Sequence, residues 1–133
     1  MIKPIPTKDA TGASNGHLIP IHSDALSDYR VAQVYVTTVN EGCMKGPHRH
    51  NRRSGRFLCL SGDVKIVTRT WTTYKEHFSG QASGYNIVEV PPGVAAAIYN
   101  IGGGPAMVLN MPDKPWTKED PDDQPVEAWD YKR

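Results

Sequence analysis

The chain has 133 residues, a formal net charge of +1, 38% hydrophobic residues and 22% charged residues. This composition is typical of a soluble globular protein, and the length suits one domain with its own core. A chain so close to neutrality has no overall field that would attract a nucleic acid or an anionic membrane, so we expect neither as a partner.

The charges are nevertheless divided unevenly. Residues 1–111 contain eleven Lys and Arg against seven Asp and Glu, whereas residues 112–133 contain four against seven. A mildly basic body favours a small anionic ligand. The two cysteines are too few for a disulfide framework, and their spacing fits no zinc pattern. The sequence contains no bilayer-length apolar stretch and no signal-peptide core near its start, which favours a cytoplasmic location.

The predicted elements begin with an arm. Residues 1–29 mix turn-forming residues with short apolar pieces, which indicates an N-terminal arm with one or two short strands. Residues 31–39 are rich in Val, Thr and Tyr and predict a strand that carries Tyr35 and Thr37 on one face.

The segment between Gly42 and Gly62 is the most unusual part of the sequence. His48 and His50 are two residues apart, so on a strand they share a face. A cluster of four arginines follows within the next few residues and flanks them: Arg49, Arg52, Arg53 and Arg56. The apolar run 57–60 then predicts a strand. This segment is a strand–loop–strand unit that directs two imidazoles and several guanidinium groups to one place.

The remaining elements predict further short strands. We expect strands over 63–71, 85–90, 94–100 and 106–111, with a polar loop over 72–83. Glycine- and proline-rich turns separate them, and no window has a helical period. The tail from residue 112 is polar, with Trp116 and Trp129 as candidate anchors. The pattern predicts an all-β sandwich or barrel in a single domain, with an arm at 1–29, a core at 30–111 and a tail at 112–133.

Two spaced motifs resemble those of the cupin superfamily. Gly42, His48-x-His50 and Gly62 have the spacing of the first cupin motif, with Gly55 at the position of its glutamate. The second motif is similar to Pro91-x-Gly93-x2-Ala96-x3-Asn100, with Ala96 at the position of its histidine. The resemblance implies a double-stranded β-helix, which is a jelly-roll barrel.

The two replaced residues bear on metal binding. In metal-binding cupins the glutamate and the second histidine complete the ligand set, and two imidazoles alone hold a first-row metal weakly. His77 is the remaining candidate for a third ligand. We therefore expect no metal and no other cofactor.

Within the cupins, the chain resembles the branch of dTDP-4-dehydrorhamnose 3,5-epimerase. The resemblance lies in residues 48–53, 57–58, 90–95, 108–112 and 119–122. It implies a metal-independent epimerase or isomerase that acts on a nucleotide-linked 4-keto-6-deoxy sugar. His48 matches the position of the general base, and Lys45 stands where the family has an arginine. Asp113 and Asp130 are only near candidates for the carboxylate partner of the base.

The chemistry requires a base near neutrality and a group that stabilises an enolate. We predict His48 as the base, with His50, Tyr35 or Tyr99 assisting. The alternative for His48 is a histidine kept from a metal-binding ancestor. Two other functions stay open: a catalytically reduced cupin that binds a sugar or nucleotide-sugar, and a metal-dependent small-molecule enzyme.

Candidate substrate-binding residues follow from the anionic substrate that the resemblance implies. Guanidinium groups bind phosphate oxygens in pairs, which favours Arg53 and Arg56 together with Lys45. The alternatives for the cluster are a solvated loop and pairing with the acidic tail of a second subunit. Trp71 could stack on a base or sugar, although packing is the commoner role of tryptophan. Asn110 is predicted to face the cavity, with the strand exterior as the alternative. We also expect a homodimer, because most oligomers are two-fold.

Overall fold

The computed structural model describes residues 1–22 and 30–133, and in these ranges every regular element is a strand. The all-β class is confirmed. The last seven residues of the predicted arm, 23–29, lie outside the described residues. The strands are β1 (Ile5–Lys8), β2 (Ser14–Leu18), β3 (Tyr35–Val39), β4 (Met44–His48), β5 (Gly55–Ser61), β6 (Asp63–Thr70), β7 (Thr73–Gly80), β8 (Val88–Val90), β9 (Ala95–Asn100) and β10 (Ala106–Asn110).

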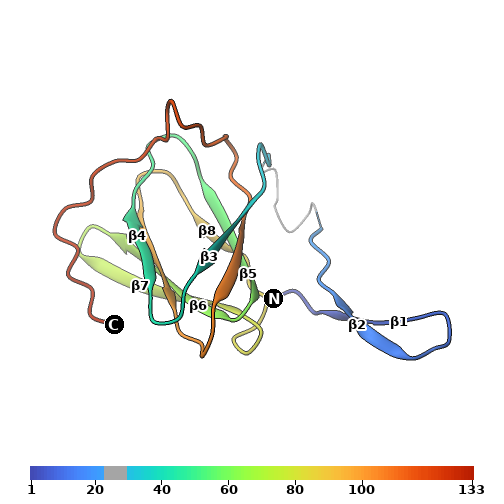
Figure 1. Ribbon diagram of the computed structural model, residues 1–133. Helices are drawn as coiled ribbons and strands as arrows, with labels where there is room; N and C mark the ends of the chain where they lie inside the picture. Colours follow the sequence, from blue (N-terminus) through green and yellow to red (C-terminus); the bar gives the residue numbers. More distant parts are fainter. Residues whose placement is uncertain (23–29) are drawn as a thin grey trace.

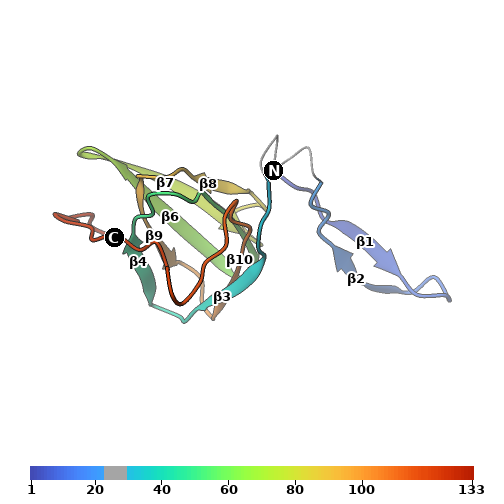
Figure 2. The same ribbon diagram turned by 90° about the horizontal axis from the view of Figure 1, so that it is seen from above.

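Eight of these strands form the barrel. They pair antiparallel in two four-stranded sheets, with the orders β3-β10-β5-β8 and β4-β9-β6-β7. The strands of the two sheets wrap around a common interior (Figure 1). The side chains that fill this interior are apolar, as the alternating strand pattern predicts. The hairpin of β1 and β2 projects away from the barrel in both views (Figures 1 and 2). Within the described ranges, no helix is long and apolar enough to cross a bilayer.

The core lies between the two sheets. Val39, Cys59, Val64, Ile66 and Val108 are each 1% exposed or less and pack together. They come from four strands whose inward positions alternate with outward ones, which is the arrangement expected of facing sheets. Burial raises the pKa of the Cys59 thiol to about 11, so this cysteine is a neutral core residue.

The C-terminal tail covers the outer face of the sheet β4-β9-β6-β7. Trp129 and Tyr131 pack over an outward-facing cluster that contains Val67 and Tyr99. The Trp129 indole N–H donates to the Tyr99 hydroxyl at 3.1 Å. The tail therefore acts as the outer layer for a sheet whose strands are apolar on both faces.

The predicted loop over 72–83 is wrong, because residues 73–80 form β7. This strand pairs with β6 along its whole length, from Thr70↔Thr73 to Asp63↔Gly80. A tight turn at Trp71, which has a φ of 58°, closes the hairpin. Five other predicted strands are shorter than expected: β3 begins at Tyr35, β6 ends at Thr70, β8 begins at Val88, β9 begins at Ala95 and β10 ends at Asn110.

Candidate functional site

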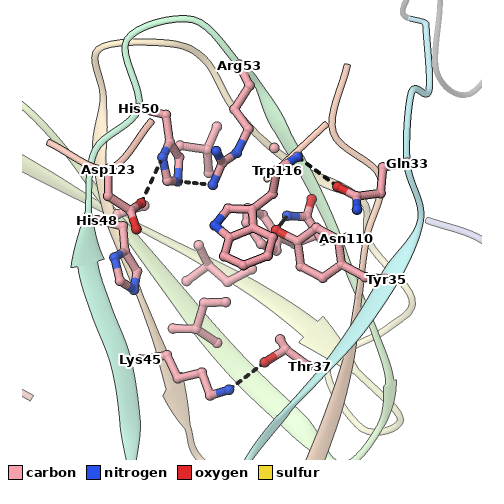
Figure 3. A pocket seen from close by; sticks show the side chains of 16 residues that line it. Gln33, Tyr35, Thr37, Lys45, His48, His50, Arg53, Asn110, Trp116 and Asp123 are labelled. Carbon is pink, nitrogen blue, oxygen red and sulfur yellow. Dashed lines mark hydrogen bonds and ion pairs between the residues drawn. The ribbon is translucent and has the colours of Figure 1, made fainter. Parts of the chain in front are cut away.

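A cavity of about 650 Å³ opens between the two sheets. Its floor is apolar. Inward-facing side chains of four strands form it: Phe57, Ile66, Val90, Ala96 and Ile98. Polar side chains stand above this floor on two sides (Figure 3). The histidines come from β4 and the loop after it, and Tyr35 comes from β3 in the other sheet. A ligand in the cavity would therefore lie between them.

The end of β4 is shaped by a close approach to β9. The register of this pair shifts between Lys45 and His48, which brings His48 opposite Ala96. Gly46 lies in the shift with a φ of 97°, and a Cβ there would be 2.8 Å from the Ala96 carbonyl oxygen. Only glycine suits both the backbone conformation and the spacing. Gly46 therefore allows the turn of the strand that directs His48 into the cavity.

His48 is an exposed imidazole on the cavity wall. It makes no hydrogen bond or ion pair with any residue in the described part of the chain. Its ring stacks near that of His50, with centroids 6.3 Å apart and an angle of 14° between the planes. The ring nitrogens of His48 are therefore available to a ligand.

His50, in contrast, is held by the tail. Its Nδ1 lies 2.8 Å from the carbonyl oxygen of Asp122 and 3.2 Å from a carboxylate oxygen of Asp123. Its Nε2 lies 3.4 Å from the Arg53 guanidinium. Burial lowers the pKa of His50, the Asp122 carbonyl opposes this, and the Arg53 charge adds to the lowering. These contacts favour a neutral ring with its proton on Nδ1.

Tyr35 and Asn110 form a hydrogen-bonded pair on the other wall. The Asn110 side-chain oxygen accepts the Arg56 backbone N–H at 3.1 Å, so the amide nitrogen faces Tyr35. That nitrogen donates to the Tyr35 hydroxyl oxygen at 2.7 Å. Since the hydroxyl oxygen accepts this bond, its own hydrogen is free to be donated to a ligand. Of the two positions that the sequence left open for Asn110, the cavity and the strand exterior, the residue lies on the cavity.

The arginine cluster is largely engaged by other parts of the same chain. Arg52 pairs with Asp120, the Arg53 guanidinium donates to the Pro121 carbonyl, and Arg56 lies 3.2 Å from Glu89. Of the sequence alternatives, pairing with an acidic tail is closest to what is observed, but the tail belongs to this chain. Arg53 is the member of the cluster that lines the cavity.

Three predicted site residues lie away from the cavity. Arg56 points outward because it follows the inward-facing Gly55, and Tyr99 packs under the tail on the outer face. Trp71 is 93% exposed at the β6–β7 turn. The predicted residues that line the cavity are His48, His50, Tyr35, Lys45, Arg53 and Asn110.

The cavity is also lined by residues that were not predicted as site residues from the sequence. Trp116 and Gln33 lie at its rim, where the Trp116 backbone N–H donates to the Gln33 side chain at 2.8 Å. Asp123 provides the carboxylate nearest to His50. The two earlier candidates are used elsewhere, since Asp113 accepts the Ser54 N–H and Asp130 accepts the Tyr74 hydroxyl. The opposite charges of the acidic tail and the arginine-rich loop were the feature of the sequence that could have predicted their contact.

The residues present do not fit a cupin metal centre. In the described part of the chain, no three His, Cys, Asp or Glu side chains gather as a ligand set. A Cβ on Gly55 would lie 2.6 Å from the Phe57 ring, which fills the space of the motif glutamate. His77 lies on β7, where its Nε2 is 3.1 Å from the Thr68 hydroxyl.

Comparison with known proteins identifies the family of the chain. The model of the polysaccharide biosynthesis C-terminal domain family matches residues 21–124. The chain belongs to this family. No protein of curated function matches it significantly.

Several solved structures have a similar fold. A dTDP sugar isomerase from Desulfovibrio desulfuricans is 20% identical, with a TM-score of 0.79, over 96% of this chain and 83% of that one. QdtA, a sugar 3,4-ketoisomerase from Thermoanaerobacterium thermosaccharolyticum solved with TDP, is 23% identical, with a TM-score of 0.67, over 90% and 82%. NovW, a 4-keto-6-deoxy sugar epimerase from Streptomyces spheroides, is 16% identical, with a TM-score of 0.66, over 87% and 63%. These likenesses confirm the cupin-like barrel.

Proposed function

We propose that this family member is a metal-independent isomerase or epimerase that acts on a nucleotide-linked 4-keto-6-deoxy sugar. One observation carries the proposal: an unengaged imidazole, His48, and a free hydroxyl donor, Tyr35, stand on opposite walls of a cavity with an apolar floor. The barrel that the chain shares with a dTDP sugar isomerase, a 3,4-ketoisomerase and a 4-keto-6-deoxy sugar epimerase supports the substrate class.

The residues suit proton abstraction next to a ketone. His48 would accept the proton from C3, and the electron pair of that bond would form the C3–C4 double bond. The negative charge that develops on O4 would be stabilised by the Tyr35 hydroxyl, whose oxygen is already fixed by Asn110. The apolar floor would keep water away from this intermediate.

The position at which the proton returns would decide the product. His48 and His50 stand on the same side of the cavity. If the O3 hydroxyl proton passes to O4 and one of these histidines returns a proton to C4 from that side, the product is the 3-keto isomer. A proton delivered to C3 from the opposite side, where Tyr35 stands, would give the C3 epimer. The stacked arrangement of the two histidines favours the isomer.

The cavity also suits the anionic part of such a substrate. Lys45 extends a flexible ammonium group along the wall, where it donates to the Thr37 hydroxyl. Arg53 lines the same cavity. The indole of Trp116 offers a flat surface at the rim (Figure 3). These groups would hold the phosphates and the base, while the sugar lies over the floor.

A second candidate is a binding protein without turnover. The replacement of the two motif positions by Gly55 and Ala96 favours it, because the cavity then has fewer polar groups than an ion-binding cupin. A homodimer and a cytoplasmic location also remain predictions from the sequence.

Solvent exchange separates the two functions. In D2O we expect the protein to place deuterium at C4 of the 3-keto isomer, and at C3 of dTDP-4-keto-6-deoxyglucose whenever the proton returns to C3. NMR and mass spectrometry would measure deuterium at both positions. His48→Ala should slow this exchange by about 100-fold or more, because it removes the base. His48 is exposed, so the variant should fold.

Trp71→Ala is the matched control, since Trp71 lies on an exposed turn away from the cavity. The rate of deuterium exchange by this variant should equal that of the unaltered protein. Tight binding of the nucleotide-sugar with no exchange above the buffer rate would reject the enzyme and leave the binding protein.

A further inference from the structure

The tail segment 120–124 lies against the loop that follows His50. We infer that Asp122 is a positioning residue that fixes His50 as the tautomer with its proton on Nδ1. This inference about the tautomer does not depend on the proposed function.

The Asp122 carboxylate anchors the tail to the loop. It accepts backbone N–H bonds from three consecutive residues: Asn51 at 3.2 Å, Arg52 at 2.9 Å and Arg53 at 3.3 Å. The residue is 6% exposed, and its φ of 54° lies in the left-handed region that aspartate tolerates better than most residues. The three bonds hold the backbone in this conformation.

The same backbone conformation presents the Asp122 carbonyl to the histidine ring. His50 Nδ1 lies 2.8 Å from that oxygen. On the next residue but one, the Gln124 N–H donates to the Arg49 carbonyl at 2.8 Å, so the tail is tied to the chain on both sides of His50. Asp122 thus fixes the loop through its side chain and the ring through its main chain.

These contacts select one tautomer of the neutral ring. A carbonyl oxygen only accepts hydrogen bonds, so Nδ1 must carry the hydrogen and Nε2 the lone pair. The Arg53 guanidinium, a pure donor, faces Nε2 and agrees with this assignment. Asp123 adds a second acceptor at Nδ1, but its side chain is 45% exposed, so we assign the main effect to the buried Asp122.

The tautomer can be read directly by NMR without any substrate. We propose long-range 1H–15N spectra of the full chain labelled with 15N-histidine, at a pH where the rings are neutral. In the unaltered protein we expect His50 Nδ1 at the shift of a protonated nitrogen and Nε2 at that of an unprotonated one. Asp122→Ala should move the ring toward the tautomer protonated on Nε2, which is the favoured form of free histidine.

Two further variants control for a general loss of structure. Asp120→Ala removes a neighbouring carboxylate that forms an exposed ion pair with Arg52, and it should leave the His50 tautomer unchanged. Asp122→Asn keeps one acceptor oxygen and should restore part of the Nδ1-protonated signal even if the alanine variant does not fold.

The inference would be overturned by a ring protonated on Nε2 in the unaltered protein. An unchanged tautomer in folded Asp122→Ala would overturn it equally. If the tautomer behaves as expected but the unaltered protein places no deuterium on the sugar, the proposed function fails while the role of Asp122 stands.

Discussion

The two histidines of the motif differ in how the chain holds them. His48 is exposed and unengaged by the described residues, whereas His50 is bonded to Asp122 and lies beside Asp123. Their shared face follows from the two-residue spacing and could be predicted from the sequence. Their different surroundings could not, because the partners of His50 lie 72 and 73 residues further along the chain.

Tyr35 gives a prediction at this scale. Tyr35→Phe removes the hydroxyl donor that would stabilise the charge on O4, so the rate of sugar turnover should fall by about 100-fold with little change in substrate affinity. Steady-state kinetics would measure both quantities.

Tyr99→Phe is the control, because the Tyr99 hydroxyl lies under the tail and accepts a bond from Trp129. It should leave the turnover rate unchanged. Equal losses in the two variants would show that the hydroxyl of Tyr35 has no special part in the reaction.

At the scale of elements, the tail is the part of the chain that links the outer face to the cavity. It contributes Trp116 and Asp123 to the cavity, and its last residues pack on Tyr74 and Tyr99. An acidic, proline-rich segment has no periodic pattern, so the sequence indicated anchors without showing where they attach. The loop predicted over 72–83 was wrong for a related reason, because pairing with β6 makes a strand of a polar segment.

Trp129 tests the tail as a structural element. Its indole contacts the Tyr74 ring edge-to-face, with centroids 5.1 Å apart, and donates to Tyr99. Trp129 is only half-buried, so Trp129→Ala should lower the free energy of unfolding by about 2 kcal/mol, below the usual cost for a core tryptophan. Urea denaturation followed by circular dichroism would measure it.

Trp116→Ala offers the comparison, since Trp116 is 43% exposed at the cavity rim. We expect a change of about 0.5 kcal/mol or less. A larger loss at Trp116 than at Trp129 would mean that the tail is held at the cavity and not on the outer face.

At the scale of the whole molecule, alternation and turns predicted an all-β sandwich or barrel, and the motif resemblance narrowed this to the jelly-roll barrel. Val64 and Ile66 face inward as their spacing requires, and the glycine- and proline-rich turns separate β8, β9 and β10 where expected. The pairing of β3 with β10 joins Tyr35 to Asn110 across 75 residues. No local pattern specifies such a pairing, and the motif resemblance implied the barrel that contains it.

The most direct test of the proposed activity is a crystal structure of His48→Ala with dTDP-4-keto-6-deoxyglucose bound. We predict that the sugar lies over Phe57 and Ile66, with C3 facing the position vacated by the imidazole and O4 within hydrogen-bond distance of the Tyr35 hydroxyl. A sugar bound outside the cavity, or with its keto oxygen directed away from Tyr35, would contradict the account.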